Sequence, residues 1–187
     1  MKRILVVAFA VMAWSPAWAQ LGIITRAVTT TMDVRTKAEV TADAEISGGA
    51  SKRLLGDKKA EWTGVTVLVF AQHVVLAGAV KTDAVKKRVE ELVKQDKRIR
   101  SLKNELLVGD VSSLARDTAL EAEINAKLTA AKGISSVNMR WCATGGRVVL
   151  MGVAQSQHES DAALQKIRPI KGVKTVVAHL RVVPHKK

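Results

Sequence analysis

The hydrophobic positions of this chain follow two periods, and each period occurs twice. Apolar residues recur at every fourth position at Ile46, Ala50 and Leu54, and again between 120 and 128, as on the buried face of an α-helix. The side chains of Val65–Phe70 alternate with the two-residue period of a β-strand, and those from 137 to 142 do the same. The pattern therefore predicts a helix followed by a strand in each half of the chain.

A second strand, a second helix and a third strand follow in each half. The second strands are the octets HVVLAGAV, from residue 73, and RVVLMGVA, from residue 147. Gly145-Gly146 predicts a tight hairpin turn before the second octet, and Ala71-Gln72 is a poorer turn sequence at the equivalent place. A helical stripe over 85–93, and a weaker one over 163–167, precede last strands that begin near 102 and 176.

The two octets lie 74 residues apart, and this offset holds without a gap over most of the chain. It relates Asp43 to Asp117, Gly78 to Gly152, and Val108 to Val182. A fixed internal period is the signature of a duplicated structural unit. The two copies, over 43–108 and 117–182, indicate two tandem domains.

We therefore expect an α+β protein with two tandem αββαβ domains, each a three-stranded mixed sheet with two helices on one face. The second strand is apolar on both of its faces, so the face without helices should be covered by the other domain or by a partner. The predicted division is a leader over 1–19, an extended segment over 20–42, a first domain over 43–109, a linker over 110–116, a second domain over 117–183 and a basic tail over 184–187.

Several residues carry local expectations within this fold. Asp43 and Asp117 are placed to cap the first helix of each domain with a carboxylate. Gly48-Gly49 should leave the first helix frayed or shortened, because each glycine costs about 1 kcal/mol relative to alanine. Gly78 and Gly152 lie in the middle of strands and indicate a bend or the close approach of another backbone.

The N-terminal residues have the layout of a secretory signal peptide. Lys2 and Arg3 precede an apolar stretch over 4–14, which is too short to cross about 30 Å of hydrocarbon. Ala17-Trp18-Ala19 forms a small-residue cleavage site. Cleavage after Ala19 would leave Gln20 at the mature N-terminus in place of an acylated cysteine. We expect an exported, periplasmic protein that is not a lipoprotein and that can associate peripherally with a membrane.

Charge narrows the class of partner. The chain has 30 Lys and Arg against 17 Asp and Glu, a net charge of +13, and removal of Lys2 and Arg3 with the leader lowers it to +11. Such an excess points to an anionic partner. Because export removes nucleic acid from reach, anionic phospholipid, lipopolysaccharide and acidic envelope proteins remain.

Reactive residues do not form a catalytic or metal-binding pattern in the sequence. The four histidines are scattered, and no pair has the spacing of metal ligands. Cys142 is the only cysteine, so it is either a reactive or intermolecular thiol or a small residue within a sheet. Trp141 falls on a core-type strand position and should be buried, whereas Trp62 is the better candidate for an exposed aromatic. We predict no enzyme activity, no cofactor and no metal.

The repeated motifs resemble the BON domain, which occurs in tandem in bacterial envelope proteins. The residues that carry the resemblance are Val74–Gly78 with Ile99–Val108, and Val148–Gly152 with Gly172–Val176. The motif glycines are Gly78, Gly152 and Gly172.

The segments Asp33–Thr36 and Ser112–Thr118 are similar to those of the family members that bind anionic phospholipid. In those members the lipid site lies on the first helix of the second domain and includes a tryptophan, where this chain has Ala119 and Leu120. The resemblance implies a lipid site formed by Arg116, Leu120, Ile124, Lys127, Lys132 and Arg140. A secondary basic patch consists of Lys94, Lys97, Arg98 and Arg100.

Two functions follow from these expectations. The first is a non-enzymatic periplasmic protein that binds anionic phospholipid through its basic surfaces and maintains the envelope. The alternative is an osmotic or envelope-stress scaffold that binds other envelope proteins through the open face of its sheet. Acidic residues are interspersed among the basic ones, so a merely solvated surface is a further interpretation of the charge.

Overall fold

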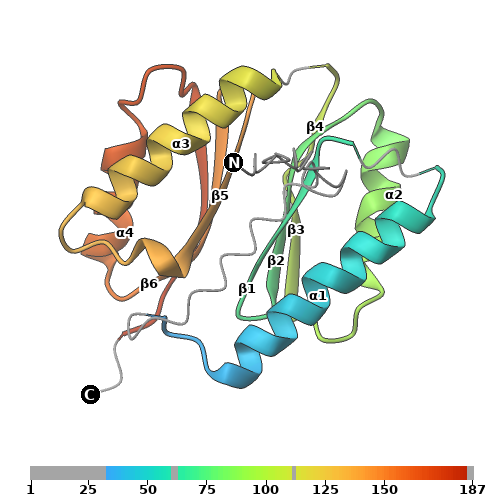
Figure 1. Ribbon diagram of the computed structural model, residues 1–187, viewed down its shortest axis with the longest axis horizontal. Coiled ribbons are helices and arrows are strands. Elements are labelled where there is room, and N and C mark those ends of the chain that lie inside the picture. Colours follow the sequence, from blue (N-terminus) through green and yellow to red (C-terminus); the bar gives the residue numbers. More distant parts are fainter. Residues whose placement is uncertain (1–32, 60–62, 111–112, 185–187) are drawn as a thin grey trace, which may run out of the picture.

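The computed structural model of the chain contains two α+β domains whose sheets face each other, with the helices outside (Figure 1). The structure describes residues 33–59, 63–110 and 113–184. The predicted leader, Trp62 and the end of the basic tail lie outside the described residues.

The first domain has the predicted order of elements. These are α1 (Lys37–Gly56), β1 (Val65–Phe70), β2 (His73–Val80), α2 (Asp83–Lys94), β3 (Ser101–Asn104) and β4 (Leu107–Val108). The central strand β2 pairs antiparallel with β1 and parallel with both β3 and β4. β3 and β4 keep the same register against β2, so they are one strand that is interrupted at Glu105 and Leu106.

The second domain repeats this arrangement. Its elements are α3 (Leu114–Ala130), β5 (Met139–Thr144), β6 (Arg147–Ala154), α4 (Gln157–Ile167) and β7 (Thr175–Val182). β6 pairs antiparallel with β5 and parallel with β7. Residues 136–138 form a short 3-10 helix, so β5 begins two residues later than the alternation predicted. The α+β class and the two αββαβ units are confirmed.

The first helix of each domain begins earlier than predicted, and the aspartates are not its caps. Thr36 caps α1 in a reciprocal capping box with Glu39, and Ser113 precedes α3. Both helices therefore start inside segments that we expected to be extended or linking. α1 is also helical through Gly48-Gly49 and is longer than α3, with 20 residues against 17, so the expected shortening is wrong. Ile46, Ala50 and Leu54 pack in the core and outweigh the low helix propensity of glycine.

The aspartates support the β-hairpin turns instead of the helix ends. The Asp43 carboxylate accepts hydrogen bonds from the backbone N–H groups of Ala71 and Gln72, at 2.8 and 2.7 Å. Both turn residues have positive φ angles of 50° and 65°. Such angles strain residues other than glycine, and the type of turn that joins two adjacent strands requires them. In the second domain Gly145 donates to Asp117 at 2.9 Å, and glycine occupies both turn positions.

Each domain has a core between its helices and its sheet, and a third core joins the two sheets. The helix-facing side chains of β2 include Val74, Leu76 and Val80, as the alternation predicted. The opposite sheet faces bury one shared cluster, which consists of Leu68, Phe70, Ala71, Val75, Ala77, Cys142, Val149, Met151 and Val153. The face that the sequence left open is therefore covered by the other copy and is not available to a partner protein. This observation corrects the binding surface of the scaffold hypothesis.

Gly78 and Gly152 occupy positions that exclude any larger side chain. A Cβ atom on Gly78 would lie 1.9 Å from the Gly64 carbonyl oxygen, and one on Gly152 would lie 2.1 Å from that of Asn138. Both glycines also have positive φ angles. The expected close approach of a neighbouring backbone is confirmed at both positions.

Candidate functional site

An apolar groove flanked by two lysines lies between the helices of the second domain. Its lining residues are Ala126, Lys127, Ala130, Ala131 and Lys166, and its volume is about 340 Å³. The alanines lie at the C-terminal end of α3 and just beyond it, and Lys166 lies near the C-terminal end of α4. Both lysines are exposed, so their ammonium groups can reach an anion in solution or on a surface.

The first domain closes the equivalent surface with ion pairs. The 74-residue offset relates Ala131 to Asp57 and Ala162 to Arg88. Arg88 donates to the Asp57 carboxylate from Nε at 2.9 Å and from Nη2 at 2.6 Å. Leu92, the equivalent of Lys166, is buried.

A second acidic residue of the first domain also has no counterpart in the second. Asp96 is buried and bonds Arg53 at 3.2 Å and Arg98 at 2.8 Å. Hydrogen bonds from Arg98 hold the pKa of Asp96 well below its ordinary value, against the effect of burial. The equivalent residue is Ile170, so Lys127, the equivalent of Arg53, forms no ion pair within the described residues. Arg53 and Arg88 are thus paired with carboxylates between α1 and α2, whereas Lys127 and Lys166 form no ion pair within the described residues.

The six residues predicted for the lipid site do not form one surface. Leu120 and Ile124 are buried in the core of the second domain and hold α3 against its sheet, so they cannot contact a ligand from solution. Lys127 and Lys132 are exposed near the C-terminal end of α3. Arg116 is exposed in the first turn of that helix, about 16 Å away by the helical rise.

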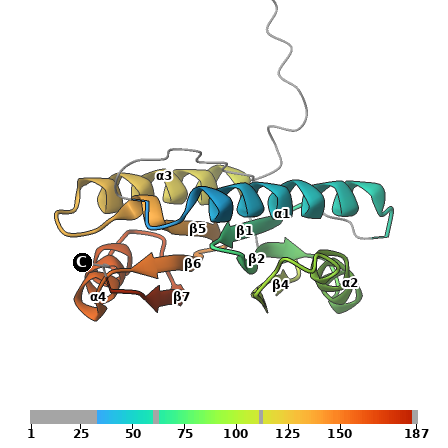
Figure 2. The same cartoon turned by 90° about the horizontal axis from the view of Figure 1, so that it is seen from below.

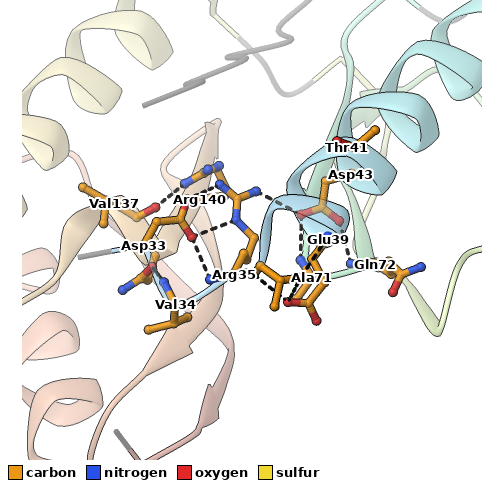
Figure 3. A network of polar contacts seen from close by, with 12 residues as sticks. Asp33, Val34, Arg35, Glu39, Thr41, Asp43, Ala71, Gln72, Val137 and Arg140 are labelled. Carbon is orange, nitrogen blue, oxygen red and sulfur yellow. Dashed lines mark hydrogen bonds and ion pairs between the residues drawn. The ribbon is translucent and has the colours of Figure 1, made fainter. Parts of the chain in front are cut away.

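Arg140 lies between the domains, beside the segment that precedes α1 (Figure 3). Its guanidinium donates to the carbonyl oxygens of Val137 and Met139 and lies 5.4 Å from the centre of the Phe70 ring. Arg35 lies over the same ring at 4.5 Å. Arg140 therefore belongs to the contact between the two domains and not to the surface of α3.

The segment 33–35 ties the two domains together. The Val34 N–H donates to the Asn138 side chain of the second domain at 3.1 Å. Arg35 is almost fully buried and forms ion pairs with Asp33 at 2.7 Å and with Asp43 at 2.9 Å. Burial would raise the pKa of Asp33, but hydrogen bonds from Arg35 and its charge, with that of Arg140, hold it below the ordinary value.

The secondary basic patch is divided in the same way. Lys94 and Lys97 are exposed and unpaired within the part of the chain that the structure describes. Arg98 is paired with Asp96 and Glu45, and Arg100 contacts Glu39 at 3.4 Å. Lys94 and Lys97 therefore carry unpaired charges, whereas Arg98 and Arg100 each face a carboxylate.

Cys142 is a buried residue of the core between the sheets. Burial, with a contribution from the charge of Glu121, raises the pKa of its thiol to about 11, which disfavours the reactive thiolate. Burial also raises the pKa of Glu121, although that carboxylate accepts a hydrogen bond from the Ala143 N–H. Trp141 is buried in the second core, as predicted.

The described residues contain neither a metal-binding cluster nor a membrane-spanning helix. Within 33–59, 63–110 and 113–184, no cluster of three or more His, Cys, Asp or Glu side chains could bind a metal ion. No helix in these ranges combines the length and the apolar character that a membrane crossing needs.

The groove alanines were not predicted as site residues, and Lys166 was not among the six residues predicted for the lipid site. Their signal is a difference between the copies: at the 74-residue offset, two aspartates of the first copy become Ala131 and Ile170 in the second. Gly172, the third motif glycine, has a φ of 98° and open space around it, so it serves the turn before β7.

Comparisons with known proteins agree with this architecture. The model of the BON domain matches residues 42–110 and 116–184. An uncharacterized protein in the gshII 5′ region of Anaplasma centrale is 33% identical over 125 residues, which cover 65% of this chain and 83% of that protein. Osmotically-inducible protein Y of Escherichia coli is 29% identical over 144 residues, which cover 74% of this chain and 72% of that protein.

Among solved structures, CdsD, a structural protein of the type III secretion system of Chlamydia trachomatis, matches with a TM-score of 0.33 and 16% identity. The match covers 77% of this chain and 65% of that one, and this similarity is too low to support an argument. The two matched ranges of the BON model coincide with the two αββαβ units. The chain belongs to the BON domain family and carries two BON domains in tandem.

Proposed function

We propose that this protein is a non-enzymatic periplasmic protein that binds anionic phospholipid surfaces through its second domain and helps to maintain the envelope. Family membership and similarity to an osmotically inducible protein support a non-enzymatic role at the envelope. The basic net charge and the predicted leader support export and an anionic partner.

The observation that carries the proposal is the groove between α3 and α4, whose two lysines form no ion pair within the described residues. Lys127 and Lys166 flank a strip of alanines that an apolar group can contact, while the lysines attract a phosphate. An anionic phospholipid presents both kinds of group at a membrane surface. Lys132, Arg168 and Lys171 are also exposed, and no ion pair involves them within the described residues.

The expected strength of attachment follows from these charges. Each basic side chain near an anionic bilayer contributes about 1 kcal/mol, and the contribution decreases with ionic strength because salt screens exposed charges. Loss of two such residues should weaken binding by about 30-fold. Attachment of this kind is reversible and sensitive to salt.

Vesicle sedimentation tests the proposal. We expect the protein to bind vesicles of phosphatidylcholine that contain phosphatidylglycerol, and to bind less as salt rises. The double variant Lys127→Glu/Lys166→Glu should lose binding. The matched control Lys94→Glu/Lys97→Glu makes the same change in net charge at two exposed, unpaired lysines of the first domain and should retain most of it. Equal binding to neutral and anionic vesicles would refute the proposal and favour a protein partner.

A second pair of variants separates shape from charge. Ala130→Leu places a larger apolar side chain in the groove without a change in charge, and Ala122→Leu makes the same substitution at an exposed position of α3 outside the groove. Weaker vesicle binding for the first variant alone would mean that the groove itself holds part of the lipid. Equal binding by both variants would mean that the surface acts through charge only.

A further inference from the structure

The two domains also meet at one edge of their sheets. β4 and β7 lie on the same side of the molecule, opposite the side along which α1 and α3 run (Figure 2). Glu105, in the interruption between β3 and β4, contacts His179 Nε2 of β7 at 2.9 Å and forms an ion pair with Arg147 at the start of β6. One carboxylate of the first domain thus neutralises a basic residue of the second.

The duplication predicts a matching contact that the sequence does not complete. The 74-residue offset relates Arg147 to His73 and Glu105 to His179. The first domain supplies the Glu105 carboxylate to the second domain, but at the equivalent position the second domain has the imidazole of His179. The side chains around His73 therefore lack the equivalent of Glu105.

Arg181 of the second domain and Arg100 of the first lie near enough for their charges to interact. Arg181 follows His179 by two residues on β7 and so lies on the same face of the strand. Its side chain has no hydrogen bond or ion pair within the described part of the chain. Burial and then the charge of Arg100 lower the pKa of Arg181, as expected when two guanidinium groups lie near each other.

His73 and Ser101 complete the cluster. His73 Nδ1 lies 2.6 Å from the Ser101 hydroxyl oxygen. Burial, followed by the charges of Arg181 and Arg100, lowers the pKa of His73 and favours its neutral ring. When the hydroxyl donates to Nδ1, the neutral ring keeps its proton on Nε2 and has a hydrogen-bond donor left for a ligand.

The nearby carboxylates are already used. Asp43 accepts bonds from Arg35 and from the hairpin turn, and Glu39 accepts bonds from the Thr36 backbone and hydroxyl within the cap of α1. Glu39 also makes the 3.4 Å contact with Arg100, so one carboxylate faces two guanidinium groups. The cluster keeps a positive charge that an external anion can neutralise.

We propose that Arg181, Arg100 and His73 form a binding site for a small oxyanion, such as phosphate or the phosphate group of a monoester, between the two domains. The anion supplies the negative charge that the second domain, which has His179 where the first has Glu105, does not supply. Guanidinium groups suit it because their paired N–H donors match two oxygens of a phosphate. Since the ligand contacts both domains, it strengthens the contact between them.

Inorganic phosphate is the probe. In urea unfolding near neutral pH, with ionic strength held constant by sodium chloride, phosphate at ten times its Kd should lower the ratio of unfolded to folded protein about 11-fold. In an NMR titration with phosphate, the ring signals of His73 should shift and reach a plateau, and the titration should give the same Kd as the unfolding experiment. Arg181→Gln should weaken binding at least about tenfold, because a charged hydrogen-bond donor is lost. The control Lys97→Gln removes an exposed charge elsewhere and should bind like the wild type.

An absence of saturable shifts at His73 in the wild type would overturn the proposal, and so would unchanged phosphate affinity in Arg181→Gln. If Arg181→Gln does not fold, Arg100→Gln is the second test, and unchanged affinity there has the same meaning. The experiment contains no vesicles, so its failure would leave the proposed membrane function untouched. Conversely, phosphate binding in a protein that ignores anionic vesicles would support this site alone.

Discussion

Asp43 should contribute more to the free energy of unfolding than Asp117, its equivalent in the second domain. Replacing Asp43 with alanine removes hydrogen bonds to Ala71, Gln72 and Arg35. The Arg35 side chain is only 6% exposed, so its guanidinium cannot replace the lost bond with one to water, although it keeps its ion pair with Asp33. The Ala71-Gln72 turn also loses the carboxylate that holds two non-glycine residues at positive φ.

The magnitude follows from these contacts. Removing one partner of a buried ion pair costs about 3–5 kcal/mol when the other charge is left without a partner. Because Arg35 keeps its ion pair with Asp33, we expect Asp43→Ala to cost about 3 kcal/mol, at the lower end of this range. The matched variant Asp117→Ala loses bonds to Gly145 and Ser113, both from partly buried N–H groups, and breaks no ion pair within the described residues. It should cost about 2 kcal/mol, because glycine adopts the turn geometry of the second domain without strain.

Urea unfolding followed by circular dichroism measures both free energies, and hydrogen exchange measures the turn itself. In Asp43→Ala the amides of Ala71 and Gln72 should exchange much faster than in the wild type, because the turn opens locally. The core amides of β2 should exchange faster only by the factor that corresponds to the global loss of stability. Equal losses of stability in the two variants would refute the reasoning. So would full protection of both turn amides in Asp43→Ala.

Three further predictions concern buried positions. Gly78→Ala and Gly152→Ala should each cost about 3 kcal/mol or more in urea unfolding, because the new Cβ meets a backbone carbonyl at a positive φ. Glu121→Gln should raise stability at neutral pH: burial raises the pKa of Glu121, so the wild type loses stability as pH rises from the ordinary carboxyl pKa through the raised value, and the variant does not. Cys142 should react with a thiol reagent at mildly alkaline pH only as fast as the protein opens, because its thiol is buried with a pKa of about 11.

Each of these predictions has a contrary result. Gly172→Ala is the control for the strand glycines, because its positive φ lies in open space and should cost only about 1 kcal/mol. Equal costs at Gly172 and Gly78 would contradict the steric argument. A pH profile of stability that is unchanged by Glu121→Gln would contradict the assignment of the raised pKa. Reaction of Cys142 at the rate of a free thiol would mean that the two sheets do not stay packed.

The candidate site was predicted only in part, because the prediction combined residues from the buried and the exposed faces of α3. Lys127 and Lys132 were expected from the resemblance, and both are exposed. Leu120 and Ile124 were expected on the same helix, but their four-residue spacing is that of a buried face, and the structure buries them. A ligand site needs the exposed face of α3, and the hydrophobic period identifies which face is not exposed.

The sequence by itself determined the number of domains, the order of their elements, the strand faces and the two glycines that a neighbouring backbone approaches. These features depend on local periodicity and on a fixed repeat, both of which are properties of residues close in sequence or at a constant offset. Only the tertiary structure decided that Asp43 supports a hairpin turn 28 residues away and that the sheet faces without helices pack against each other. It also decided that Lys127 and Lys166 have no acidic partner within the described residues. Those outcomes depend on distances between residues remote in sequence, which are fixed when the sheets pack together and bury their apolar faces.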